Sequence, residues 1–86
     1  MAMSKWAKLI DQIVRGTGDA NIPFDDLGHL LERMGFERRT HGSHNIFRKA
    51  GISEKPNLQR AGVNAKPYQV RQVRDMIVKY KLGDHI

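Results

Sequence analysis

The chain has 86 residues, of which 28% are charged and 40% are hydrophobic, and it contains no cysteine. This length allows one small folded domain, and the composition is typical of globular proteins rather than disordered tails. The absence of cysteine excludes disulfides and thiolate metal sites. Apolar runs are too short to cross a bilayer and no signal-peptide pattern opens the chain, so we predict a cytoplasmic protein.

The net charge of +6 is unevenly distributed along the chain. Residues 33–82 contain twelve Lys and Arg against three acidic residues, whereas residues 1–32 have a net charge of −2. Such a basic excess favours a polyanionic partner, because neutralising phosphates releases counterions. A solvated basic surface, or a site for an acidic protein, would account for the charge equally well.

A first helix is expected from Ser4, whose hydroxyl can cap free amides of the opening turn. Its apolar residues recur at helical spacing: Trp6, Leu9, Ile10, Ile13 and Val14. Residues 16–21 are rich in Gly, Asn and Asp and end it. We therefore divide the chain into an N-terminal helix with its linker, residues 1–20, and a main domain, residues 21–83. The sequence leaves open whether the stripe packs on this domain or on a partner.

The main domain begins with a helix from about Pro23 to Met34, followed by Gly35 as its cap, and His29 lies off its apolar stripe. Two strands are predicted at residues 36–40 and 44–49, with Gly42 allowing the reversal between them. A weak third strand at residues 57–60 precedes a last helix that starts at Pro67 and stops at Gly83. We predict an α+β fold of order α-β-β-β-α with an extra N-terminal helix. Its three-stranded antiparallel sheet has the helices on one face and leaves the other exposed.

Alternation along the second strand places its side chains on two faces. If Phe47 packs under the helices, then His44, Ile46 and Arg48 lie on the exposed face, with Leu58 of the third strand pointing inward. An imidazole can take a proton from a ribose 2′-hydroxyl or give one to a leaving oxygen. A lone strand histidine is nevertheless more often an ordinary surface residue.

Basic residues around His44 are candidates for holding a phosphodiester, namely Arg48, Lys49 and Lys66. Lys66 also precedes a helix start, where free amides attract anions, although ordinary helix initiation explains it equally well. Gly42 and Ser43 also have a local explanation, because Gly supplies a positive φ and the Ser hydroxyl can bond nearby protein backbone. Ser43 has no apparent base to activate it as a nucleophile.

His41 and His44 form an H-x-x-H spacing, which raises the question of a metal site. In a strand and turn these side chains need not converge, and no cysteine or nearby carboxylate completes a tetrahedral ligand set. We predict no metal and no cofactor, and we interpret His41 as a bystander.

The motif Gly42-Ser43-His44, followed by Phe47, resembles the HicA family of toxins from bacterial toxin–antitoxin pairs. Leu30-Leu31 and Gly35-Phe36 upstream, and the segments Leu58-Gln59 and Lys66–Arg74 downstream, extend the resemblance over residues 22–82. The N-terminal helix and the long loop at residues 50–56 depart from the shortest members.

This resemblance implies a double-stranded-RNA-binding-like fold and an mRNA-cleaving endoribonuclease, or mRNA interferase, that arrests translation and growth. Its active histidine corresponds to His44, no metal is expected, and a HicB-type antitoxin would cover the site. We expect Gly42, Ser43, Arg48, Lys49 and Lys66 to contact RNA. Two alternatives are a non-catalytic RNA-binding module on the same fold, which would read shape and phosphates, and a module that binds an acidic protein.

Overall fold

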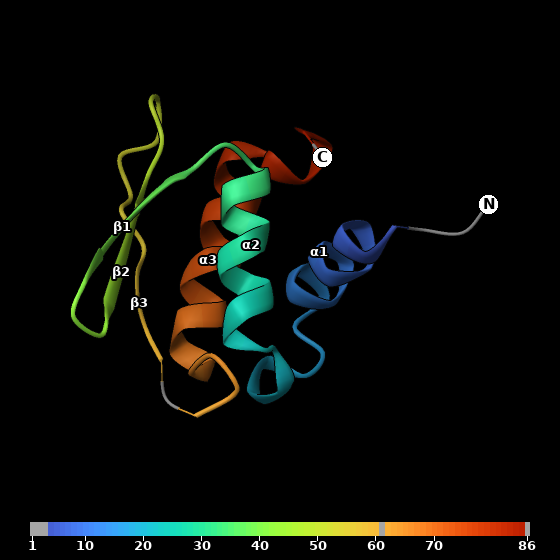
Figure 1. Ribbon diagram of the computed structural model, residues 1–86. Helices are drawn as coiled ribbons and strands as arrows, with labels where there is room; N and C mark the ends of the chain where they lie inside the picture. Colours follow the sequence, from blue (N-terminus) through green and yellow to red (C-terminus); the bar gives the residue numbers. More distant parts are fainter. Residues whose placement is uncertain (1–3, 61, 86) are drawn as a thin grey trace.

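The computed structural model describes residues 4–60 and 62–85 and has an α+β fold, as predicted (Figure 1). Three α-helices and a three-stranded antiparallel sheet of order β1-β2-β3 make up the fold. The helices are α1 (Lys5–Arg15), α2 (Phe24–Arg33) and α3 (Pro67–Tyr80), and the strands are β1 (Glu37–His41), β2 (His44–Arg48) and β3 (Asn57–Gln59). Two short 3₁₀ turns, Asp19–Asn21 and Leu82–His85, follow α1 and α3.

Helix α1 starts as the sequence predicts, because the Ser4 hydroxyl accepts a hydrogen bond from the Ala7 amide at 3.1 Å. Its apolar face is narrower than the predicted stripe. Leu9, Ile10 and Ile13 are buried, whereas Val14 is largely exposed.

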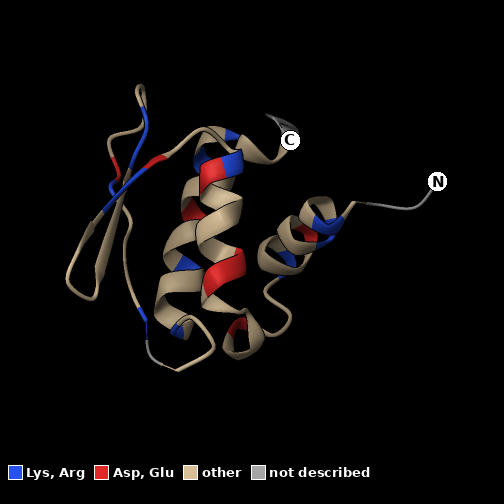
Figure 2. Ribbon diagram, viewed as in Figure 1, with Lys and Arg blue, Asp and Glu red and all other residues tan. Residues whose placement is uncertain are grey.

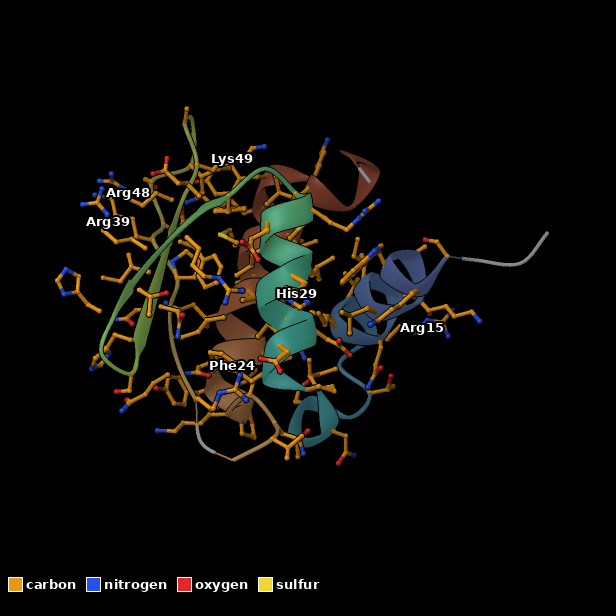
Figure 3. The ribbon with its side chains drawn as sticks, viewed as in Figure 1. Arg15, Phe24, His29, Arg39, Arg48 and Lys49 are labelled. Atoms are coloured by element: carbon orange, nitrogen blue, oxygen red, sulfur yellow. The ribbon has the colours of Figure 1, made fainter. Side chains whose placement is uncertain are left out.

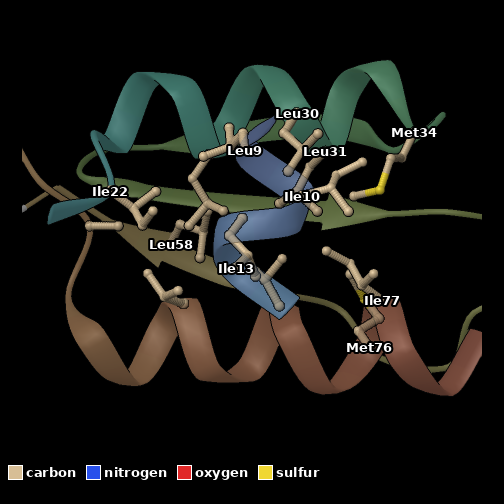
Figure 4. Close-up of a cluster of buried hydrophobic side chains, with 14 of the residues drawn as sticks. Leu9, Ile10, Ile13, Ile22, Leu30, Leu31, Met34, Leu58, Met76 and Ile77 are labelled. Atoms are coloured by element: carbon tan, nitrogen blue, oxygen red, sulfur yellow. The ribbon is translucent and has the colours of Figure 1, made fainter. Parts of the chain in front are cut away.

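The apolar face of α1 packs on this chain, which answers the question that the sequence left open. Figures 1 and 4 show α1 lying against α2 and α3, on the side away from the sheet. The buried residues of α1 belong to the same hydrophobic cluster as those of α2 and α3. The predicted boundary at residue 20 therefore runs between segments that share one core.

Arg74 of α3 fastens the end of α1 to the rest of the domain. Its Nε donates to the Ile13 carbonyl at 2.6 Å, and its guanidinium forms an ion pair with Asp19. Both charged side chains are only 20% exposed. The contact thus closes the carboxyl end of α1, where partial negative charge favours a cation.

Helix α2 has the apolar face predicted for it, with Phe24, Leu27, Leu30, Leu31 and Met34 all buried. Gly35 follows it and has a φ of 96°, in the left-handed region that often ends helices. His29 is exposed, as predicted from its position off the stripe.

The sheet has one face under helices α2 and α3 and one face free of helices (Figure 1). Phe47 and Leu58 are fully buried on the covered face, which confirms both inward assignments. Asn45 shares that face, where it accepts from the Thr40 hydroxyl at 3.0 Å and donates to the Leu58 carbonyl at 3.4 Å. The core therefore lies between the sheet and the helices.

Helix α3 begins at Pro67 as predicted, with Gln69 fully buried beneath its first turn. The Gln69 side chain accepts from the Lys66 amide at 3.3 Å and donates to the Gln59 carbonyl at 3.4 Å, so it joins this helix to β3. The helix ends at Tyr80, earlier than the predicted stop at Gly83, because Lys81 adopts a left-handed φ of 54°.

None of the helices within residues 4–60 and 62–85 has both the length and the apolar character that crossing a bilayer requires.

Candidate functional site

The turn between β1 and β2 is shorter than the sequence analysis assumed. Strand β1 continues to His41 and β2 begins at His44, which leaves only Gly42 and Ser43 in the loop. Gly42 has a φ of 59° and Ser43 does not have a positive φ, the pattern of a type II′ turn. A two-residue turn of this type matches the right-handed twist of a hairpin, which lets the strands pair up to His41 and His44. The predicted end of the first strand at residue 40 was therefore one residue short.

The two-residue loop fixes the register of the hairpin. His41 lies directly opposite His44, Arg39 opposite Ile46 and Glu37 opposite Arg48. In the other pair of strands, Ile46 is opposite Asn57 and His44 opposite Gln59. Because side chains alternate between faces, one set lies on the face away from the helices: Glu37, Arg39, His41, His44, Ile46, Arg48, Asn57 and Gln59. We call this set the open face.

His44 is exposed on the open face, as predicted, and its ring is held by a neighbouring strand. Its Nδ1 lies 3.3 Å from Oδ1 of Asn57 in β3. When Nδ1 carries the proton and donates it to Asn57, Nε2 is left as the proton acceptor of the neutral imidazole. In this tautomer Asn57 orients the His44 ring, and Nε2 is the nitrogen that can act as a base.

Ser43 is also tied to β3, because its hydroxyl accepts from Nε2 of Gln59 at 3.3 Å. This bond holds the turn against the third strand beside His44. At Gly42, a Cβ would meet no atom within 4 Å. Glycine is therefore required there by its φ and not by lack of space.

Two arginines supply positive charge to the open face. Figure 3 shows Arg39 and Arg48 extending from the sheet on the side away from the helices. Both are exposed, and they belong to adjacent cross-strand rows, with Glu37 opposite Arg48. Figure 2 shows basic residues along β1 and β2, although β1 begins with the acidic Glu37, and it shows further acidic residues on the outer surface of α2. The electrostatic potential thus favours an anionic ligand on the sheet side of the molecule over the α2 side.

Lys49 lies apart from the other predicted contact residues. Its ammonium donates to the Met34 carbonyl at 2.6 Å, at the end of α2 (Figure 3). A Cβ on Gly35 would approach the same Nζ to 2.5 Å. Lys49 thus caps a helix C-terminus, where a cation is favourable, and is not part of the open face.

Lys66 is half-buried at the start of α3 and adjoins the sheet through the bonds of Gln69 to Lys66 and Gln59. The start of α3 and the β1–β2 turn lie at the same end of the molecule (Figure 1). Lys66 therefore lies at the turn end of the molecule, at the start of a helix on the covered side of the sheet, and outside the open face.

The strongly perturbed carboxyl of the described chain is remote from the open face. Hydrogen bonds from the Tyr80 hydroxyl, then from Lys79 and Ser53, lower the pKa of Glu54 from 4.5 to about 2. The same carboxylate raises the pKa of Lys79. This cluster ties the loop before β3 to the end of α3, and it has the character of a structural contact.

A hollow of about 430 Å³ lies between α1 and the start of α2, away from the sheet. Its walls come from Lys5, Lys8, Leu9, Gln12, Pro23 and Asp26. The hollow contains none of the predicted site residues. Within residues 4–60 and 62–85, no three His, Asp or Glu side chains are grouped so as to hold a metal ion.

Asn57 and Arg39 also belong to the candidate site, although neither was predicted from the sequence. Arg39 could have been found from the loop length, because a Gly-Ser type II′ turn places residue 39 opposite residue 46. No local pattern indicates Asn57, whose place beside His44 depends on how β3 pairs with β2.

Comparisons with models of protein families, with curated proteins and with solved structures find no match to this chain.

Proposed function

We propose that this protein is an endoribonuclease of the HicA type, which cleaves mRNA with His44 as a general acid/base and thereby arrests translation and growth. The observation that carries the proposal is the exposed His44 imidazole, bonded through Nδ1 to Asn57 at 3.3 Å, on a sheet face that also presents Arg39 and Arg48. We propose the double-stranded-RNA-binding-like fold as the fold family, supported by the order α-β-β-β-α from α2 to α3, with α1 as an extra N-terminal helix.

The chemistry follows from a free Nε2 beside cationic side chains. An imidazole at this position can remove the proton of a ribose 2′-hydroxyl, whose oxygen then attacks the adjacent phosphorus. Negative charge gathers on the phosphoryl oxygens as the reaction proceeds, and the guanidinium of Arg39, the diagonal cross-strand neighbour of His44, can stabilise it, while Arg48 lies farther along β2 and can hold the RNA backbone. We propose that Gly42, Ser43 and Lys66 contact the RNA backbone next to them. Lys49 is left out, because its ammonium binds the Met34 carbonyl.

The partner that we propose is a HicB-type antitoxin, and this rests on the resemblance at Gly42-Ser43-His44. Such a partner would inhibit by covering the open face. A reading frame for a small antitoxin-like protein next to this one, whose product blocks cleavage, would support it.

The test is incubation of the purified protein with RNA, with and without EDTA, alongside two variants. His44→Ala should lower the cleavage rate by at least about 10²-fold, since positioned proton transfer accelerates a reaction by about 10²–10⁴-fold. His29→Ala is the matched control, because this exposed histidine lies on α2 and not on the sheet. Circular dichroism and thermal unfolding should show that both variants fold. Growth arrest on expression should be lost only with His44→Ala.

Full cleavage by His44→Ala would overturn the catalytic assignment. If the wild-type protein binds RNA and leaves it intact, and His44→Ala binds equally well, the chain is instead the non-catalytic RNA-binding module. That alternative draws on the same exposed basic face, so only the product analysis separates the two.

A further inference from the structure

His41 lies directly across the hairpin from His44, on the same open face. Side chains at directly opposed positions of an antiparallel pair have Cβ atoms about 4.5–5.5 Å apart. Both histidines are exposed, so a ligand on the open face can reach both rings at once. The two-residue turn creates this pairing, because it makes His41 the last residue of β1 instead of a loop residue.

The two imidazoles have different surroundings. His44 is bonded through Nδ1 to Asn57, which leaves Nε2 as its acceptor. His41 is on the edge strand of the sheet, with no third strand beyond it in the described chain. The charged or titratable groups that share the open face with His41 are Arg39 and Glu37 on β1 and His44 and Arg48 on β2. Strand β3 contributes only amide side chains to this face.

We propose that His41 is the second proton-transfer residue of the site. His44 takes the proton of the 2′-hydroxyl, and His41, as an imidazolium, gives a proton to the leaving 5′-oxygen. This inference rests on the proposed RNA cleavage by His44 and adds the acid that such cleavage needs.

The step is balanced without any further reactant. The 2′-oxygen forms a bond to phosphorus as the bond from phosphorus to the 5′-oxygen breaks, which yields a 2′,3′-cyclic phosphate and a 5′-hydroxyl. In-line displacement places the attacking and leaving oxygens on opposite sides of the phosphorus. Two histidines whose Cβ atoms are about 5 Å apart, with the His44 ring turned toward Asn57 on β3, can flank a phosphate in this way. One imidazole gains a proton and the other loses one, and exchange with water restores both.

The experiment separates acid from base with a modified substrate. The cleavage site is first mapped with the wild-type protein, and an RNA oligonucleotide is then made with sulfur in place of the bridging 5′-oxygen at that site. A thiolate leaves without being protonated, so this substrate does not need a general acid. His41→Ala should slow cleavage of the normal RNA by about 10²-fold or more and that of the sulfur substrate by less than about tenfold. His44→Ala should slow both.

A second variant, His41→Asn, keeps a polar side chain on the strand and should behave like His41→Ala, with a thermal midpoint close to the wild type. Equal slowing of both substrates in the His41 variants would overturn the proposal, because it would show that His41 only binds RNA. Cleavage of the unmodified RNA by the His41 variants at the wild-type rate would overturn the proposal as well. If the wild-type protein fails to cleave, or His44→Ala cleaves fully, the proposed function itself falls.

Discussion

Removing the Arg74 side chain should loosen α1 from the rest of the domain. The guanidinium donates to the Ile13 carbonyl at 2.6 Å and pairs with Asp19, and both charged side chains are 20% exposed. Breaking a fully buried ion pair costs about 3–5 kcal/mol, and a hydrogen bond from a charged group contributes about 1.5–3 kcal/mol. Water reaches this pair in part, and the Ile13 carbonyl still accepts from the Gly16 amide at 3.1 Å.

We therefore expect Arg74→Ala to lower the free energy of unfolding by about 2–3 kcal/mol, below the limit for a fully buried pair. Urea denaturation should show this as a fall in the midpoint of about 0.7–3 M, given slopes of about 1–3 kcal/mol per molar urea. Arg71→Ala is the matched control, because Arg71 is exposed on the same helix, and it should change stability by less than about 0.5 kcal/mol. The double variant with Asp19→Ala should show a coupling energy of about 1–2 kcal/mol.

The reasoning would be refuted if Arg74→Ala and Arg71→Ala unfolded at the same urea concentration. It would also fail if the effects of Arg74→Ala and Asp19→Ala were additive. The first result would mean that the contacts of Arg74 do not hold α1 in place, and the second that Arg74 acts through the Ile13 carbonyl and not through Asp19.

Three further predictions concern other contacts. Glu54→Gln should reduce the fall in thermal midpoint between pH 5 and pH 2. The lowered pKa of Glu54 stabilises the folded protein above pH 4.5, its pKa in the unfolded chain, and this stabilisation is lost as the pH falls toward 2. An unchanged dependence of the thermal midpoint on pH would contradict it. Gly28→Ala should destabilise by about 1 kcal/mol despite better helix propensity, because its Cβ would collide with the Arg38 guanidinium, which is held over the Phe47 ring. Urea denaturation in an Arg38→Met background should reverse the sign. Asn57→Ala should slow RNA cleavage about tenfold and shift the His44 ring toward the tautomer protonated at Nε2. Nitrogen NMR spectra report the tautomer, and unchanged spectra would exclude an orienting role for Asn57.

Periodicity in the sequence predicted most of the fold. Apolar residues at helical spacing located all three helices, and Ser4, Gly35 and Pro67 marked three of their ends within a residue. The period of two along β2 was enough to place Phe47 inside and His44 and Arg48 outside. These patterns succeed because burial dictates the residue type at each of those positions.

The turn was the place where sequence reasoning was least accurate, and one residue there changes the site. A strand ending at residue 40 leaves His41 in the loop, whereas the observed strand places it opposite His44. The alternation of side chains along β2 could also have excluded Lys49 from the open face, since Lys49 must share the covered face with Phe47. Asn57 could not be placed, because its contact with His44 depends on pairing between strands separated by a long loop.

Strand β1 explains why this region was hard to predict and why it suits function. None of its five residues is fully buried, so the core does not restrict their chemistry. Arg38 and Thr40 turn toward the helices, where the Arg38 guanidinium lies 4.9 Å from the centre of the Phe47 ring and the Thr40 hydroxyl donates to Asn45. The exposed Arg39 and His41 are therefore free to serve a ligand, and a charged edge strand also resists pairing with other chains. Replacing Arg39 should weaken RNA binding without unfolding the protein, which would separate function from stability on this strand.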